Sequence, residues 1–264
     1  MPSNGISLHV EEDGKGPALL MIAGLGYSSW CWQELSAALR DQFHVIRFDN
    51  RGTGRSDKPP GPYSIPMLAD DAAAVLDARG VESAHVLGHS MGGYIALTLA
   101  LRHPGRVRSL MLASTSPGGP DAEPMPQITV DVWRQAASLT PQEYARRSMP
   151  KSFAPGWTER HLDEFEDFLK RRLEYPTPME CWSAQYAACA EYVTQGVDVA
   201  RIDRPALVVH GDADNVVPFA NGRLLSRRLP RAEWAPVAGV GHLPFLEQPD
   251  AFAGSARRFF ASTA

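Results

Sequence analysis

The sequence reads Gly88-His89-Ser90-Met91-Gly92 at the point that decides its interpretation. The bare pattern G-x-S-x-G is common by chance, but here an apolar run typical of a buried strand (residues 84–87) precedes it and a helical run (94–100) follows it. Glycines on both sides of a serine remove the Cβ atoms that would obstruct a tight strand-to-helix turn. The stretch therefore predicts a nucleophile elbow, with Ser90 at the turn as the attacking group.

Such an elbow also needs hydrogen-bond donors for the negative charge that develops when the serine attacks. The Met91 N–H is expected in the first turn of the following helix, where N–H groups lack helical partners and the helix dipole is positive. A second donor should come from the loop after an earlier strand. The Leu25 N–H is our candidate, because Gly24 and Gly26 let the backbone approach closely.

The base that activates Ser90 should be a histidine close to it in space. We select His242 from the eight histidines because it follows a predicted strand and lies in a glycine-rich loop before the last helix. The acid that orients this base should lie between the two in the chain, on a loop after a strand. Asp212 and Asp214 both meet this condition. Asp214 is favoured because it stands further along the loop, four residues before Pro218.

Strand and helix patterns alternate along most of the chain, which is typical of a mostly parallel sheet with helices on both faces. Residues 6–10 alternate in polarity and are expected as an edge strand. From residue 117 to about 201 the strand patterns disappear, and aromatic and charged residues recur at helical intervals. We therefore expect an α/β core of residues 1–116 and 202–264, with residues 117–201 as an inserted helical cap.

The cap is expected to cover Ser90 and to line a substrate pocket. Its aromatic residues are dense for a segment without strands, and small-molecule pockets are mostly apolar. We expect the pocket walls to include Tyr27, Trp133, Trp157, Trp182, Tyr186 and Val216. The alternative role for each aromatic residue of the cap is simple packing of the cap against the sheet.

Composition narrows the classes of partner. The formal net charge of −4 argues against nucleic-acid binding, which requires a basic surface. Three cysteines, Cys31, Cys181 and Cys189, lack zinc-like spacing, and their small number favours a reducing compartment. No signal peptide is visible at the start, and the apolar runs are too short to cross a bilayer. We expect a cytoplasmic protein without a membrane partner, and the oligomeric state stays open.

Four segments together resemble the α/β-hydrolase superfamily: residues 49–56 (Asp-Asn-Arg-Gly-Thr-Gly-Arg-Ser), 88–93, 211–218 and 241–249. The resemblance covers the whole chain except the insertion, and is strongest to the 3-oxoadipate enol-lactonase and small carboxylesterase branch. It implies a sheet of about eight strands, a lid between strands six and seven, and Asp214 as the acid. One departure is Ala23-Gly24, where many members have His-Gly, so only a backbone donor remains there.

The expected activity is hydrolysis of a small ester or lactone through an acyl-enzyme, without a metal or an organic cofactor. No G-x-G-x-x-G or G-x-x-x-x-G-K-S pattern supports nucleotide binding. Two alternatives stay open: a ligand receptor on the same fold, and a cofactor-free perhydrolase or haloperoxidase. Haloalkane dehalogenases and epoxide hydrolases use an aspartate nucleophile, so Ser90 argues against both. Carbon–carbon bond hydrolases commonly carry Asn at the position of His89 and rank lower.

Overall fold

A seven-stranded sheet forms the centre of the computed structural model, which describes residues 2–3, 5–135 and 138–263. Its strands, in the order in which they lie side by side, are β3 (Val10–Asp13), β5 (His44–Phe48), β4 (Ala18–Ile22), β6 (Ala84–His89), β7 (Val107–Ala113), β8 (Ala206–Gly211) and β9 (Ala232–Val237). Only β3 runs antiparallel to its neighbour. The predicted fold class is therefore confirmed, with seven strands described where about eight were expected.

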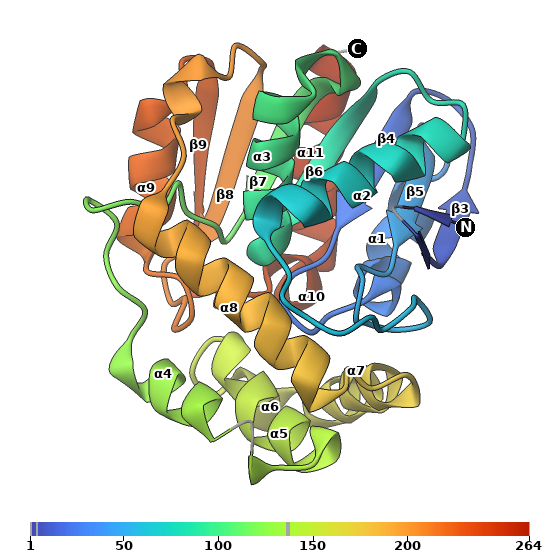
Figure 1. The fold of residues 1–264 in the computed structure, drawn as a ribbon. Coiled ribbons are helices and arrows are strands. Elements are labelled where there is room, and N and C mark those ends of the chain that lie inside the picture. Colours follow the sequence, from blue (N-terminus) through green and yellow to red (C-terminus); the bar gives the residue numbers. More distant parts are fainter. Residues whose placement is uncertain (1, 4, 136–137, 264) are drawn as a thin grey trace.

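The central strands are buried on both faces, as parallel strands between two helix layers must be. Along β4, Leu20 and Ile22 belong to one apolar core, whereas Leu19 and Met21 belong to the other. Five helices supply most of the covering layers: α2 (Ile65–Ala78), α3 (Met91–Arg102) and α9 (Phe219–Arg228) on one face, and α1 (Gln33–Leu39) and α11 (Pro249–Ser262) on the other. Figure 1 shows both layers against the sheet.

The expected edge strand at residues 6–10 is divided. Residues Ile6–Ser7 form β2, which pairs with β1 (Pro2–Ser3) away from the main sheet, and the edge of the main sheet is β3. The reason lies in the turn at residues 49–57. The Ser7 carbonyl accepts the Asp57 N–H (2.9 Å), and the His9 N–H donates to Ser56 Oγ (2.9 Å). Because their backbone groups bind this turn, Ser7 and His9 do not pair with a neighbouring strand of the main sheet.

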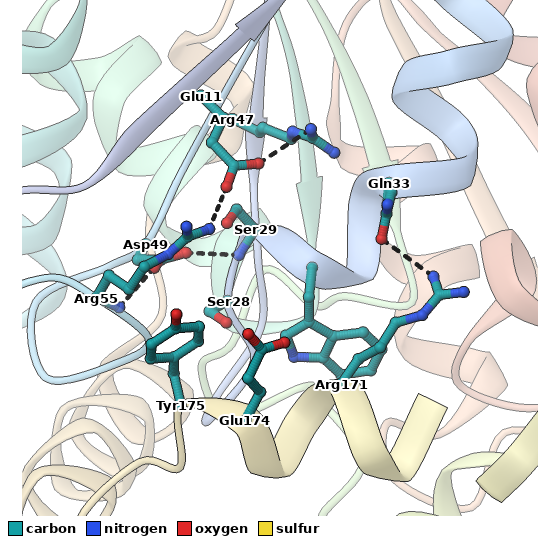
Figure 2. A pocket seen from close by; sticks show the side chains of 11 residues that line it. Glu11, Ser28, Ser29, Gln33, Arg47, Asp49, Arg55, Arg171, Glu174 and Tyr175 are labelled. Atoms are coloured by element: carbon teal, nitrogen blue, oxygen red, sulfur yellow. Dashed lines mark hydrogen bonds and ion pairs between the residues drawn. The ribbon is translucent and has the colours of Figure 1, made fainter. Parts of the chain in front are cut away.

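Asp49 holds that turn in shape (Figure 2). Its Oδ1 accepts the Ser29 N–H and its Oδ2 the Arg55 N–H, each at 2.7 Å. Gly54 has φ of +52°, and a Cβ there would lie 2.1 Å from Asp49 Oδ2, so only glycine fits.

The turn borders a cavity of about 380 Å³. Most of the charged side chains that line this cavity pair with neighbours, as in the contact of Arg47 with Glu11 at 3.0 Å, and Ser90 does not line it.

The segment between β7 and β8 contains helices and no strand among its described residues. They are α4 (Gln127–Arg134), α5 (Pro141–Ser148), α6 (Trp157–Arg160), α7 (Leu162–Glu174) and α8 (Met179–Gln195). In Figure 1, α4 to α7 gather beyond one end of the sheet, and α8 runs back toward it. The two margins of the segment touch: the Gly119 N–H donates to the Val193 carbonyl (2.9 Å), and the Val197 N–H donates to the Pro117 carbonyl (3.1 Å).

The remaining short helices are η1 (Ser29–Trp32), η2 (Pro104–Arg106), η4 (Met149–Ser152), η5 (Val199–Arg201) and α10 (Pro244–Glu247). Within residues 2–3, 5–135 and 138–263, no helix is both long enough and apolar enough to span a bilayer.

Candidate active site

Ser90 sits on a strained turn between β6 and α3. Its φ of 54° and ψ of −118° lie outside the regions that non-glycine residues prefer, as a nucleophile elbow requires. A Cβ on Gly88 would lie 2.3 Å from the Gly92 carbonyl oxygen, and one on Gly92 would lie 2.0 Å from the Ile22 carbonyl oxygen. The turn is therefore closed only because both flanking residues are glycine.

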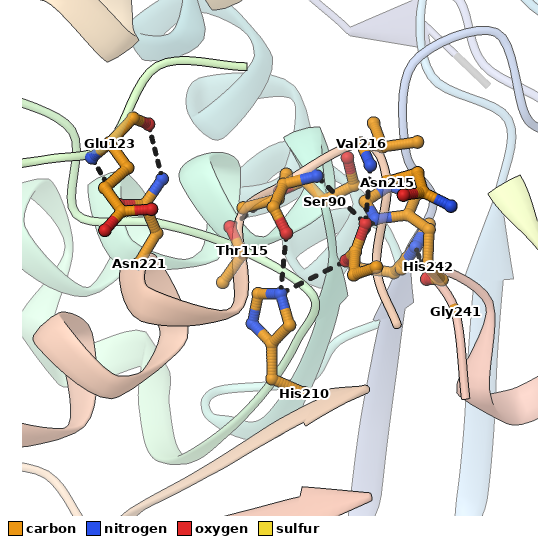
Figure 3. Close-up of polar contacts among 12 residues, drawn as sticks. Ser90, Thr115, Glu123, His210, Asn215, Val216, Asn221, Gly241 and His242 are labelled. Carbon is orange, nitrogen blue, oxygen red and sulfur yellow. Dashed lines mark hydrogen bonds and ion pairs between the residues drawn. The ribbon is translucent and has the colours of Figure 1, made fainter. Parts of the chain in front are cut away.

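Two hydrogen bonds fix the Ser90 backbone from the neighbouring strand end. Its N–H donates to the Ala113 carbonyl (3.0 Å), and its carbonyl accepts the Thr115 hydroxyl (2.9 Å, Figure 3). These contacts tie the elbow to β7, so that the serine is presented by the rigid sheet and not by a free loop.

The two expected oxyanion donors flank this elbow. Met91 is the first residue of α3, and Leu25 borders the same cavity as Ser90. Neither backbone N–H donates to another residue that the structure describes. A Cβ on Gly24 would lie 3.2 Å from Ser90 Cβ, so the absence of a side chain at residue 24 favours the close approach of this loop to the serine.

The structure brings His242 and Asp214 together. His242 Nδ1 lies 2.8 Å from Asp214 Oδ2, and both side chains are buried. Since the carboxylate accepts here, the His242 hydrogen is on Nδ1, and Nε2 carries a free lone pair. This is the tautomer that a general base needs.

Asp214 is saturated with donors. Its Oδ1 accepts the N–H groups of Val216 (2.8 Å) and Val217 (2.9 Å), while its Oδ2 faces His242 and also His210 Nε2 at 3.1 Å (Figure 3). Burial alone would raise the pKa of Asp214, but the two imidazoles and their hydrogen bonds hold this pKa well below its usual range. The group is therefore a stable buried carboxylate.

Asp212 has a different position. It is exposed, and its Oδ1 accepts the Gly239 N–H at 2.7 Å. It contacts the turn before the His242 loop and makes no contact with the His242 imidazole among the described residues, so the two aspartates have different surroundings.

His89 connects the elbow to the His242 loop. Its Nε2–H donates to the His242 carbonyl (2.9 Å), and the two rings lie 4.7 Å apart. Burial, followed by the charge of His242, holds the pKa of His89 well below its usual value, which suits a neutral structural donor.

No hydrogen bond joins the Ser90 hydroxyl to the His242 ring within the described chain.

A mostly apolar cavity of about 220 Å³ opens beside Ser90. Of the six predicted pocket residues, Trp133, Tyr186 and Val216 line it. Tyr27 and Trp182 instead border a neighbouring cavity of about 30 Å³, whose wall also includes Trp133 and Val216.

Trp157 lines neither cavity. It stacks on Phe153 at 4.4 Å and on His161 at 4.5 Å, within the apolar core that includes α7. Its ring is therefore used in packing, which was the alternative role that the sequence allowed for an aromatic residue of the cap.

Two further residues join the inserted segment to the site. Buried Gln185 of α8 accepts the Gly26 N–H (3.1 Å) and donates to the Arg51 carbonyl (2.9 Å), which holds the Leu25 loop. Glu247 accepts the N–H groups of Gly241 (3.0 Å) and Ala154 (3.1 Å), and burial raises its pKa to about 7.

Sequence reasoning did not single out Gln185, Glu247 or His210 for the site. The only available signals were the Glu-Gln-Pro motif for Glu247 and the four-residue spacing from His210 to Asp214. No cluster of three or more His, Cys, Asp or Glu side chains that could hold a metal ion occurs in the described ranges.

The sheet, the elbow and the carboxylate-bound histidine define the class of protein as an α/β hydrolase. Residues 17–249 match the family model described as the alpha/beta hydrolase fold, and the chain belongs to that family. The class and the fold expected from the sequence resemblance are thus confirmed, and the protein is a hydrolase.

Several relatives are named as hydrolases of different kinds, among them putative carbamate hydrolases, an enol-lactonase and a methyl ester esterase. The chain is 30% identical to 3-oxoadipate enol-lactonase 2 of Acinetobacter baylyi, covering 89% of this chain and 85% of that protein. It is 29% identical to the pimeloyl-[acyl-carrier protein] methyl ester esterase of Aeromonas hydrophila, covering 94% and 96%. The crystal structure of the enol-lactonase from Burkholderia xenovorans superposes with a TM-score of 0.86 at 27% identity, covering 98% of both chains.

Proposed function

We propose that this chain is a serine hydrolase that cleaves carboxylic esters or lactones through an acyl-enzyme. The observation that carries the proposal is the 2.8 Å contact between His242 Nδ1 and Asp214 Oδ2, on a loop that His89 ties to the Ser90 elbow. This contact leaves His242 Nε2 as a base, and a buried carboxylate stabilises the imidazolium that forms.

In the first half-reaction, His242 Nε2 takes the Ser90 hydroxyl proton while Ser90 Oγ bonds to the substrate carbonyl carbon. The electrons of the carbonyl double bond move to its oxygen. When they return, the bond to the alkoxy oxygen breaks, and that oxygen takes the proton from His242. The alcohol leaves, or stays attached in a lactone, and the acyl group stays on Ser90.

In the second half-reaction, His242 takes a proton from water as the water oxygen attacks the acyl carbon. The tetrahedral intermediate then releases Ser90 Oγ, which recovers its proton from His242. Asp214 keeps its charge throughout and holds the imidazole in one orientation. The product is the free carboxylic acid.

The oxyanion of each tetrahedral intermediate is assigned to the N–H groups of Leu25 and Met91. Neither N–H has a partner within the described chain, and the helix dipole of α3 adds positive potential at Met91. Such donors stabilise charge that appears only in the transition state, and removing one typically costs about 10²–10³ in turnover.

Residues 117–201 are proposed as the cap that closes the acyl or alcohol pocket. Trp133 and Tyr186 of the cap, together with Val216 of the core, form apolar walls around Ser90. The glycines at the cap margins, Gly118 and Gly196, have φ of +65° and +67° and are candidates for joints. The names of the lactonase and methyl ester esterase relatives support an ester or lactone as the substrate class.

The experiment is turnover of p-nitrophenyl acetate by the wild type, Asp214→Asn and Asp212→Asn. We expect Asp214→Asn to lose about 10⁴ in turnover because His242 adopts the wrong tautomer. Asp212→Asn should stay close to wild type. If the wild type binds the ester but does not turn it over, the protein is a ligand receptor. If the Asp212 variant is inactive and the Asp214 variant is active, Asp212 is the acid that orients His242.

A further inference from the structure

Arg172 of α7 is a buried cation without a counter-ion. It is 9% exposed and makes no ion pair or hydrogen bond with another described residue. Its neighbour Arg171 takes the nearby carboxylates of Glu34 and Asp167. Burying an unpaired charge is costly, so a buried arginine normally has an anionic partner.

The guanidinium group does have an aromatic neighbour. Its central carbon lies 4.7 Å from the centre of the Tyr27 ring. A cation–π contact orients the guanidinium plane, but it leaves the five N–H donors unused. The donors of Arg172 are therefore available to a bound group.

Arg172 borders the 30 Å³ cavity, which is rich in donors. Lys151 stands on the same wall and, like Arg172, has no ion pair or hydrogen bond in the described chain. The hydroxyl-bearing residues on this wall are Tyr27, Thr129, Tyr144, Ser148 and Ser152. None of the residues that line the cavity is an aspartate or glutamate. A second, 20 Å³ cavity on Arg172 also has no acidic residue in its lining.

This donor-rich cavity adjoins the Ser90 cavity. The two share three wall residues, namely Leu25, Trp133 and Val216. Since roughly 10–15 Å³ already admits one water, the smaller cavity has room for a carboxylate-sized group but not for a longer chain. A substrate whose ester carbonyl is at Ser90 would have to pass between these three side chains to fill it.

We propose that Arg172 and Lys151 form an anion subsite for a carboxylate carried by the substrate. The substrate class is then a half-ester of a short dicarboxylic acid, or a lactone with an acidic arm, and not a simple alkyl ester. The guanidinium would bind the carboxylate in a bidentate pair, with Lys151 as the second charge. This inference rests on the proposed ester hydrolysis at Ser90.

The test compares monomethyl glutarate with methyl 5-methylhexanoate, in which a neutral isopropyl group replaces the carboxylate. Methanol release gives kcat/KM for each ester. We expect the wild type to prefer the half-ester. Arg172→Gln should reduce the ratio of the two kcat/KM values at least tenfold, because the loss of a hydrogen bond to a charged group typically has an effect of this size. Lys151→Gln should reduce the ratio by a smaller factor. Arg146→Gln, at an exposed arginine of the cap, is the control and should keep the ratio.

Three outcomes overturn the inference. One is a wild type that prefers the neutral ester, and another is a ratio that is unchanged in both Arg172→Gln and Lys151→Gln. If Arg172→Gln does not fold, Lys151→Gln and the wild-type preference still decide. The third is covalent labelling of Ser90 by a fluorophosphonate without turnover of either methyl ester. Failure of the proposed function looks different, because p-nitrophenyl acetate would then not be turned over and Ser90 would take no fluorophosphonate.

Discussion

His210 and His242 bind the same oxygen of Asp214. His210 Nε2 lies 3.1 Å from Oδ2, and His242 Nδ1 lies 2.8 Å from it. His210 Nε2 also lies 3.0 Å from the Val217 carbonyl, so this nitrogen carries a hydrogen. The acid that orients the base is thus itself positioned by a second imidazole.

We predict that His210→Leu lowers ester turnover about tenfold or more, because Asp214 loses a donor to a charged group. His210→Gln offers an N–H at a similar distance and should restore most of the turnover. The readout is kcat for a p-nitrophenyl ester in the two variants. If the Leu and Gln variants are equally impaired, His210 acts only through packing.

We predict that Gly92→Ala unfolds far more easily than wild type. The new Cβ would lie 2.0 Å from the Ile22 carbonyl oxygen, and backbone cannot move aside as a flexible side chain can. We expect a loss of at least ~2 kcal/mol in the free energy of unfolding, measured by urea denaturation. Gly105→Ala is the matched control, since nothing lies within 4 Å of a Cβ there. Equal stability of the two variants would contradict the described elbow.

Two tryptophans of the cap should behave differently. Trp133→Ala should change the ratio of the kcat/KM values for short and long acyl chains, because Trp133 lines the Ser90 cavity. The change corresponds to roughly 1–3 kcal/mol. Trp157→Ala should keep the parent's preference and lower stability, because this ring packs on Phe153. The check is a series of p-nitrophenyl esters from acetate to octanoate. The assignment of the pocket fails if Trp157→Ala shifts the preference and Trp133→Ala does not.

Glu247 should make stability depend on pH. Burial raises the pKa of its carboxyl from 4.5 to about 7, against the lowering by the Ala154, Gly241 and Leu243 N–H groups. The folded state therefore keeps this proton up to about pH 7, whereas the unfolded chain releases it near pH 4.5. The contribution of the group to stability falls as the pH rises between these values.

Glu247→Gln cannot titrate, so it should lack this part of the pH dependence. We expect the free energy of unfolding of the wild type, relative to the variant, to be higher at pH 5 than at pH 8 in urea titrations. A difference between wild type and variant that is the same at both pH values would show that Glu247 is ionised across the range.

The sequence was sufficient for the fold class and for the placement of the elbow, because those follow from local patterns. Ser90, Asp214 and His242 each follow the end of a strand, and parallel strands bring their carboxyl ends to one edge of the sheet. The sequence and the family resemblance favoured Asp214 over Asp212, but both follow the same strand, and only the loop geometry shows that Asp214 contacts His242.

The pocket could not be derived in this way. Trp133 and Trp157 have the same chemistry, and which one faces Ser90 depends on how their helices pack. Gln185 lies 159 positions from Gly26 in the chain, so no local pattern predicts their hydrogen bond. The missing partner of Arg172 also becomes visible only when the residues around it are placed in space.

Ser90 is proposed above as the activated nucleophile. The most direct measurement is reaction with a fluorophosphonate, followed by intact-mass and peptide mass spectrometry of the wild type and Ser90→Ala. We expect one adduct per wild-type chain, located on the peptide that contains Ser90, with parallel loss of ester hydrolysis. Ser90→Ala should form no adduct and should lose turnover on the order of 10⁶. An adduct on another residue, or a Ser90→Ala variant that keeps more than about a hundredth of the activity, would contradict this assignment.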